Sequence, residues 1–320
     1  MTKIFFLYVF GFLYRLTSDM ISNENSLKSS RQYATGQRHY LNFCARLNLP
    51  ACPASELSLL RFVASFGDRI RGSTVQNYLS AVRFLHVSNG YPNPLPDCER
   101  LKLVVRALKR IAGPKRKRAP VTLSILRAVC RGINFSDYND VLLWAMICVG
   151  FFGFLRVSEF TTEGAFDPLH DLCREDLSFA ADFSLAFLQL KSSKTDPFRL
   201  GVRIVMGAST DCVCPILALS LYLNRRSNSC GALFRFANGR AVSRGWFCSN
   251  LQRVIRNTGI GGDFTSHSLR IGAASAASAA GLHPNVIQAM GRWSSEAFKI
   301  YVRYSDADKG RFSRHLVLAD

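Results

Sequence analysis

The chain has 320 residues, of which 48% are hydrophobic, a composition that supplies a sizeable core and excludes disorder along the whole chain. Its length suits two domains. Lysine and arginine number 41 against 22 aspartates plus glutamates, so the formal net charge of +19 indicates a polyanionic partner, either nucleic acid or an anionic membrane surface.

The ten cysteines do not form a zinc-binding pattern. Cys212 and Cys214 are separated by one residue, but no second pair and no histidine stands at zinc-finger spacing. The sequence also lacks a glycine-rich phosphate loop, a carboxylate cluster for two metals and a His-Glu-x-x-His motif. We therefore expect a reduced intracellular protein with no structural metal and no cofactor.

Residues 1–32 are not expected to form a domain. The first 16 residues, MTKIFFLYVFGFLYRL, form an apolar run broken by Arg15 that is too short to span a bilayer comfortably. The run is similar to the apolar part of a signal peptide, but no good small-residue cleavage site follows it. We interpret it as an unfolded or packed leader, or as an upstream translation artefact, and residues 17–32 as a flexible polar lead-in.

The sequence pattern of residues 33–113 predicts a compact bundle of four short helices. Apolar side chains recur at helical spacing from Tyr33 onward, and the first helix ends before Pro50. Ser73 is a suitable cap for the third helix. The fourth, over residues 99–111, is strongly basic, with Lys102, Arg106, Lys109 and Arg110. Residues 114–120, PKRKRAP, place four consecutive basic residues between prolines, which predicts an interdomain linker.

Residues 121–320 predict a second domain with both helices and strands. A long apolar helix leads into GFLRVSEF, residues 153–160, where Arg156 and Glu159 stand three apart in apolar surroundings. An arginine there must be paired or serve a site, because an isolated buried charge is very costly. Alternating apolar residues at 184–190 and 202–206 predict a β-hairpin, whose connection carries Lys191 and Lys194.

Residues 264–304 contain the best candidates for a site. An alanine-rich helix from Ser268 ends near Gly281, and two further short helices are expected to follow. These helices can bring four side chains to one place: His267, Arg270, Trp293 and Tyr301. Arginine offers a planar fork that matches a phosphate, histidine can carry a proton, and a tyrosine hydroxyl near such donors is a possible nucleophile.

The order of these four residues resembles the carboxyl-terminal signature of the tyrosine recombinase (phage-integrase) family: His-x-x-Arg, then His or Trp, then the nucleophilic Tyr. GRWSSEAF and YVR resemble most closely the recombinases of eukaryotic mobile elements of the DIRS and crypton kinds. GFLRVSEF resembles the family's first box, with Phe154 where glycine is common, and TVQNYLSAVRFL at 74–85 resembles its core-binding domain. The resemblance implies a mainly α fold with a small β-sheet: an N-terminal SAM-like core-binding bundle and an α+β catalytic domain.

The resemblance also implies a catalytic set, which consists of Arg156, Lys194, His267, Arg270, Trp293 and Tyr301, supported by Glu159. Tyr301 would attack the scissile phosphate and form a 3′-phosphotyrosyl link, with no metal or ATP. The arginines and the indole N–H would stabilise charge on the phosphate, His267 would handle the tyrosine proton, and Lys194 would protonate the leaving 5′ oxygen. Tyr304 is the alternative nucleophile, and Lys191 is the alternative lysine.

The expected function is site-specific recombination or integration of a mobile element. The expected partner is double-stranded DNA, bound by a homotetramer on two DNA sites, with no membrane and no small-molecule substrate; the expected location is the nucleus. A domesticated DNA-binding protein without catalysis is the second hypothesis. A type IB topoisomerase ranks last, because the larger clamp regions of that class do not fit in this short chain.

Overall fold

The computed structural model describes residues 27–67, 69–113, 118–191, 193, 196, 200–227, 229–302, 304 and 306–315. The chain separates into two compact units, Met1–Arg116 and Lys117–Asp320. This division falls inside residues 114–120, for which the sequence predicts a linker. The leader expected over residues 1–32 lies mostly outside the described residues.

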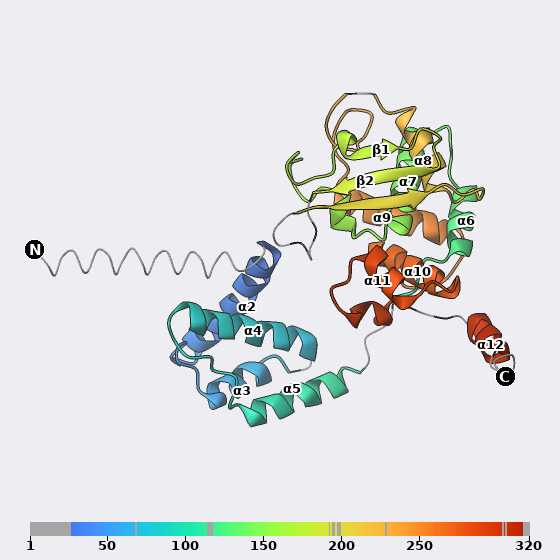
Figure 1. Cartoon of the computed structure of the whole chain (residues 1–320). Helices are drawn as coiled ribbons and strands as arrows, with labels where there is room; N and C mark the ends of the chain where they lie inside the picture. The colour runs from blue at the N-terminus through green and yellow to red at the C-terminus, as the bar shows by residue number, and fades with distance from the viewer. Residues whose placement is uncertain are drawn as a thin grey trace, which may run out of the picture. The chain divides into compact units, whose positions relative to one another are not determined.

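In the described part of the N-terminal unit, helices are the only regular secondary structure (Figure 1): α2 (Leu27–Arg46), α3 (Glu56–Ala64), α4 (Gly72–Ser88) and α5 (Glu99–Ile111). The first of them begins before Tyr33, where the apolar pattern starts. Residues 28–32 are all polar, so hydrophobic periodicity does not mark this turn of the helix. None of the helices in the described ranges combines the length and the apolar character that a membrane span needs.

Aromatic side chains fill the core of this unit. Tyr40 of α2 is fully buried, packs edge-on against Phe62 of α3 with ring centres 5.2 Å apart, and donates its hydroxyl to the carbonyl of Ala51. The helices α2 and α4 pack closely because Gly36 lacks a side chain. A Cβ at Gly36 would lie 2.7 Å from the Cβ of Ala81.

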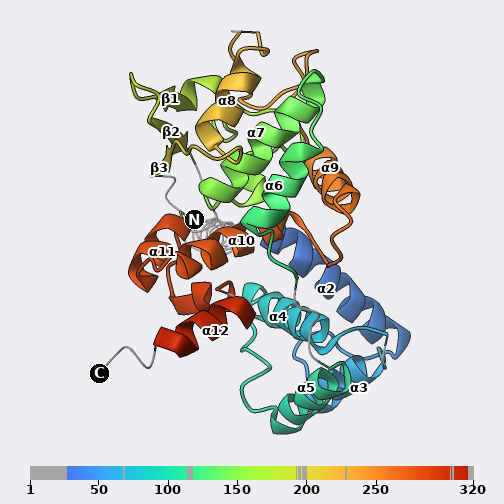
Figure 2. The same cartoon turned by 90° about the vertical axis from the view of Figure 1, so that its right-hand side faces the viewer.

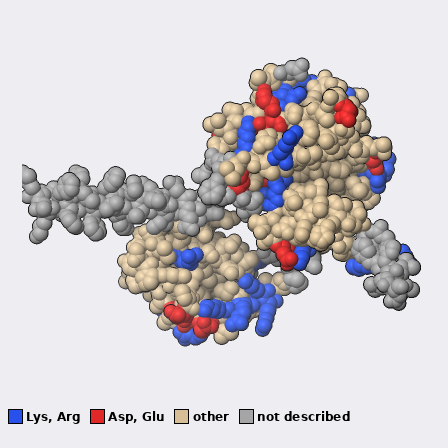
Figure 3. Space-filling model, viewed as in Figure 1, with Lys and Arg blue, Asp and Glu red and all other residues tan. Residues whose placement is uncertain are grey.

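The basic side chains of α5 face solvent. Leu101 is buried under the helix, whereas Lys102, Arg106, Lys109 and Arg110 are exposed. Figure 3 shows Lys and Arg side chains gathered on the side of the N-terminal unit that α5 forms. The helix therefore presents a positively charged surface suited to a polyanion.

The second unit contains helices around a small sheet (Figure 1). Its elements are α6 (Leu123–Arg131), α7 (Tyr138–Phe152), η1 (Val157–Glu159), η2 (Arg174–Asp176), β1 (Leu177–Phe179), β2 (Leu185–Leu190), β3 (Val202–Gly207), α8 (Pro215–Leu223), α9 (Arg244–Asn257), α10 (Ser266–Ala279), α11 (Pro284–Gly291), η3 (Glu296–Ile300) and α12 (Asp306–His315). The expected fold class, mainly α with a small β-sheet, is confirmed.

The three strands form one antiparallel sheet in the order β1-β2-β3. Leu188 of β2 stands opposite Leu177 of β1 and Ile204 of β3, and all three side chains are buried on the same face. The predicted hairpin over 184–206 is therefore present, and β1 extends it to a third strand. Period-two alternation was enough to place the hairpin because one face of the sheet meets the core.

Helix α7 is the centre of the second unit (Figure 2). Every side chain from Val141 to Phe151 is buried, and the helix packs against α8, α9 and α10. A helix that is apolar on all sides is stable only when other elements surround it. The end of α7 is therefore fixed in space, and it leads directly into the segment that carries Arg156.

Helix α10 meets the first residues of the second unit at a point of very close approach. Val121 donates its backbone N–H to the carbonyl of Ser268 at 3.0 Å. One turn later, a Cβ added at Gly272 would lie 1.8 Å from the carbonyl oxygen of Val121. Only glycine allows this contact, which fixes the start of α10 and with it His267 and Arg270.

We predict that Gly272→Ala destabilises the protein by at least about 2 kcal/mol, because the added methyl group must displace backbone rather than a flexible side chain. Gly245→Ala is the matched control: Gly245 also lies in a helix, α9, and a Cβ there meets no atom within 4 Å. The control should be neutral or slightly stabilising. Urea unfolding of both variants checks this, and equal midpoints would contradict the predicted close approach.

Candidate functional site

Arg156 and Glu159 follow the end of α7. Phe154 has φ 50°, in the left-handed region that favours glycine, and this turn redirects the chain out of the helix. The carboxylate of Glu159 accepts the backbone N–H of Arg156 at 2.8 Å and its guanidinium at 2.9 Å. The Glu159 side chain is 3% exposed and that of Arg156 is 21% exposed, so the arginine faces the surface and the acid supports it from within.

Arg270 is buried behind this pair. It lies on the second turn of α10, is 1% exposed, and donates to the carbonyl of Phe154 at 2.5 Å and to the carbonyl of Gly291. Its guanidinium carbon lies 4.4 Å from the centre of the Trp293 ring, a cation–π contact. Arg270 thus joins the ends of α7 and α11 to the start of α10.

The position of the Trp293 ring is set by the backbone conformation at the end of α11. A Cβ at Gly291 would lie 1.6 Å from the Trp293 ring, so glycine is required where the indole folds back over the helix end. Arg292 between them adopts the left-handed conformation with φ 53°. A non-glycine residue in that conformation is uncommon and is held by its surroundings.

Arg292 is a site residue that sequence reasoning missed. Its side chain is 9% exposed and forms an ion pair with Glu159 at 2.8 Å, and it also donates to the carbonyl of Gly153 at 3.1 Å. The sequence offered one signal, an arginine between Gly291 and Trp293 at a helix end. That signal does not reveal the partner, which lies 133 residues earlier in the chain.

Tyr301 lies among the predicted site residues. Its ring stacks on that of Trp293 with centres 5.6 Å apart and meets the His267 ring edge-on at 5.0 Å. Ser275 of α10 donates to the Tyr301 carbonyl at 3.0 Å, which fixes the backbone after η3. The hydroxyl of Tyr304, by contrast, pairs with that of Ser278 at 2.5 Å, further along α10.

The two candidate lysines have different outcomes. Lys194 lies outside the described residues. Lys191 forms an ion pair with Asp176 at 2.9 Å and also contacts the carbonyl of Pro168 at 2.8 Å and the sulfur of Cys173 at 3.0 Å. Burial by itself lowers the pKa of Lys191, but the hydrogen bonds to Asp176 and Cys173 outweigh it, so the pKa is raised. The contacts of Lys191 therefore suit a structural role.

The electrostatics of the site favour an anion. Burial lowers the pKa of Arg270, and the nearby charges of Arg156 and Arg292 lower it further, while Glu159 opposes them. Burial likewise lowers the pKa of Arg292. The three guanidinium groups thus carry more positive charge than the one carboxylate between them neutralises. Over the described ranges, no three His, Cys, Asp or Glu side chains are grouped so that they could hold a metal ion.

We predict that Glu159→Gln costs about 3 kcal/mol of stability, because it leaves two buried or half-buried arginines without their counter-charge. Glu56→Gln is a matched control in the N-terminal unit, where Glu56 pairs with Arg100, whose side chain is 68% exposed. That change should cost much less, because solvent screens this exposed ion pair. Urea unfolding measures both, and a loss for Glu159→Gln no larger than for Glu56→Gln would show that Glu159 does not hold the arginines.

Comparisons with known proteins agree with this fold. No family model matches the sequence, and no curated protein matches it either. Among solved structures, the XerH site-specific recombinase bound to a palindromic difH substrate has a TM-score of 0.65 and 16% identity, over 92% of this chain and 81% of that chain.

Two further structures resemble the chain over most of its length. A lambda integrase dimer bound to a COC′ core site has a TM-score of 0.60 and 14% identity, over 93% of this chain and 77% of that one. The Tn1549 transposon integrase in complex with transposon right end DNA has a TM-score of 0.57 and 13% identity, over 95% and 99%. The chain has the fold of the tyrosine recombinases.

Proposed function

We propose that this protein is a site-specific DNA recombinase or integrase that breaks and rejoins DNA through a covalent tyrosine link. The observation that carries the proposal is the meeting of Tyr301, His267 and Trp293 beside the buried Arg270, on this fold. A nucleophile next to an excess of guanidinium charge is suited to a phosphodiester.

In the proposed reaction, the Tyr301 oxygen attacks the scissile phosphorus and the bond to the 5′ oxygen breaks. The tyrosine proton passes to His267, and the leaving 5′ oxygen takes a proton from Lys194. Arg156, Arg270 and the Trp293 indole N–H stabilise the charge on the non-bridging oxygens, an effect worth several kcal/mol of barrier. The phosphotyrosyl link keeps the energy of the broken bond, so a 5′ hydroxyl of another strand can reverse the step without ATP.

The proposed partner is double-stranded DNA, bound by four copies of the chain on two sites. The net charge of +19 and the exposed basic face of α5 support a polyanionic partner. A lambda integrase tetramer bound to a Holliday junction, with a TM-score of 0.59 and 14% identity, is a structural precedent for the assembly.

The proposed source of this activity is a mobile element of the DIRS or crypton kind, acting in the nucleus. The sequence motifs GRWSSEAF and YVR support an element of the DIRS or crypton kind, because they resemble the recombinases of those elements. The run PKRKRAP supports nuclear localisation.

The test is a trapping assay with nicked suicide DNA substrates that carry candidate element ends. Wild type and Tyr304→Phe should both form a covalent protein–DNA adduct, and Tyr301→Phe should form none, since a phenyl ring offers no nucleophile. Adduct loss in Tyr304→Phe alone would move the nucleophile. Tight, salt-sensitive binding without any adduct would favour a domesticated DNA-binding protein, and relaxation of supercoiled DNA by a monomer would favour a topoisomerase.

We predict that Lys194→Met slows cleavage of a normal substrate by about 10²-fold or more, the usual contribution of a general acid. A substrate with sulfur in place of the leaving 5′ oxygen should restore the rate, because a thiolate leaves without protonation. Lys191→Met is the control and should lower stability through loss of the Asp176 pair. Rescue of Lys191→Met but not of Lys194→Met by the sulfur substrate would reverse the two roles.

A further inference from the structure

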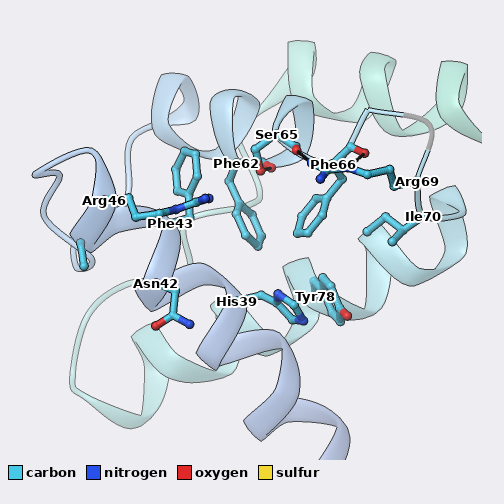
Figure 4. Close-up of a pocket in the computed structure, with 11 residues that line it drawn as sticks. His39, Asn42, Phe43, Arg46, Phe62, Ser65, Phe66, Arg69, Ile70 and Tyr78 are labelled. Atoms are coloured by element: carbon cyan, nitrogen blue, oxygen red, sulfur yellow. Dashed lines mark hydrogen bonds between the residues drawn. The ribbon is translucent and has the colours of Figure 1, made fainter.

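The N-terminal unit contains an open pocket of about 710 Å³ between α2, α3 and α4. This volume lies within the range of small-molecule sites, roughly 300–1,000 Å³. Figure 4 shows side chains from all three helices and from the loop after α3 directed into it. The pocket belongs to the N-terminal unit alone and takes no part in the site described above.

Aromatic rings form the floor and one wall of the pocket. Phe62 is buried at the floor and packs edge-on against Phe66 with ring centres 5.0 Å apart. Tyr78 and His39 are stacked, with centres 5.1 Å apart and planes at 23°. Phe66 meets both, at 5.6 Å from Tyr78 and 6.1 Å from His39. His39 is exposed, so part of this aromatic wall is open to a flat ligand (Figure 4).

The rim of the pocket is positively charged. Arg46 lies at the end of α2, and Arg69 follows α3; both are exposed. Arg69 is held in place by donation to the carbonyls of Phe66, at 3.2 Å, and Ser65. None of the described residues that line the pocket is acidic, and Asp68 lies outside the described residues. The pocket therefore combines aromatic faces with two guanidinium groups.

We propose that this pocket binds an unpaired nucleotide, with the base against His39, Tyr78 and Phe66 and the phosphate near Arg46 and Arg69. Every base has an aromatic face, so stacking holds it without regard to sequence, and arginine at the rim matches a phosphate. Bases inside an intact duplex have their faces covered by their neighbours, so only an unpaired or displaced base fits. A strand that is opened or bulged next to the protein would supply such a base.

The experiment compares the affinity of the full chain for three labelled DNAs by fluorescence anisotropy: a perfect duplex, a duplex with one unpaired adenine, and the same duplex with an abasic site at that position. Wild type should bind the unpaired adenine about tenfold more tightly than the abasic DNA, which keeps the same backbone and bend. His39→Ala and Arg69→Gln should each reduce this preference at least about threefold while leaving the affinity for the perfect duplex unchanged.

Arg61→Gln and Arg38→Gln are the matched controls, since both arginines are exposed on α3 and α2 but do not line the pocket. Both should keep the preference for the unpaired base. Thermal unfolding checks that each variant is folded. If His39→Ala does not fold, Arg69→Gln, which changes an exposed side chain, still tests the proposal.

Competition with free deoxyadenosine monophosphate shows whether the pocket accepts a free mononucleotide or only a nucleotide within a strand. Competition at millimolar concentration means that the mononucleotide suffices, and an intact preference without competition assigns the pocket to nucleotides within a strand. Equal affinity for adenine and abasic DNA overturns the proposal. An equal loss of affinity for all three DNAs in His39→Ala also overturns it, because the pocket would then be part of a general duplex-binding surface. Displacement of the DNA by an acidic aromatic peptide, but not by the mononucleotide, overturns it as well.

Discussion

The second unit depends on one buried guanidinium group. Arg270 is 1% exposed, and its donors reach the carbonyls of Phe154 and Gly291 while its face covers the Trp293 ring. A buried arginine without partners costs several kcal/mol, so the ends of α7 and α11 must come to α10 for the unit to be stable. The same contacts place Trp293, and through it Tyr301, so that the residue which organises the packing also organises the site.

The surplus of positive charge connects stability to chemistry. Arg156 and Arg292 both form ion pairs with the carboxylate of Glu159, whose charge also acts on Arg270, and burial lowers the pKa of Arg270 and Arg292. Such an arrangement is unfavourable in the free protein and becomes favourable when an anion enters. In the proposed reaction, a phosphodiester that gains charge in the transition state would be stabilised most, which is the condition for catalysis rather than tight ground-state binding.

The two units offer different kinds of recognition. The arginines of the second unit and the exposed basic face of α5 suit phosphates, which fix position but carry no sequence information. The aromatic pocket of the N-terminal unit, walled by His39, Phe66 and Tyr78, suits the face of a base. Stacking is tolerant of sequence, so the pocket would report whether a strand is open rather than which bases it contains.

The fold class could be predicted from the sequence, because the apolar run of α7 and the alternation of β2 and β3 are local patterns set by burial. Short sequence motifs that resemble those of the tyrosine recombinases also identified Tyr301, His267 and Trp293 as candidate site residues. The pairing of the charged side chains became visible only in three dimensions: Glu159 pairs with Arg292, 133 residues away in the chain, and Lys191 pairs with Asp176. The partner of a charged side chain depends on which distant segments the core brings together, and no local period in a sequence records that.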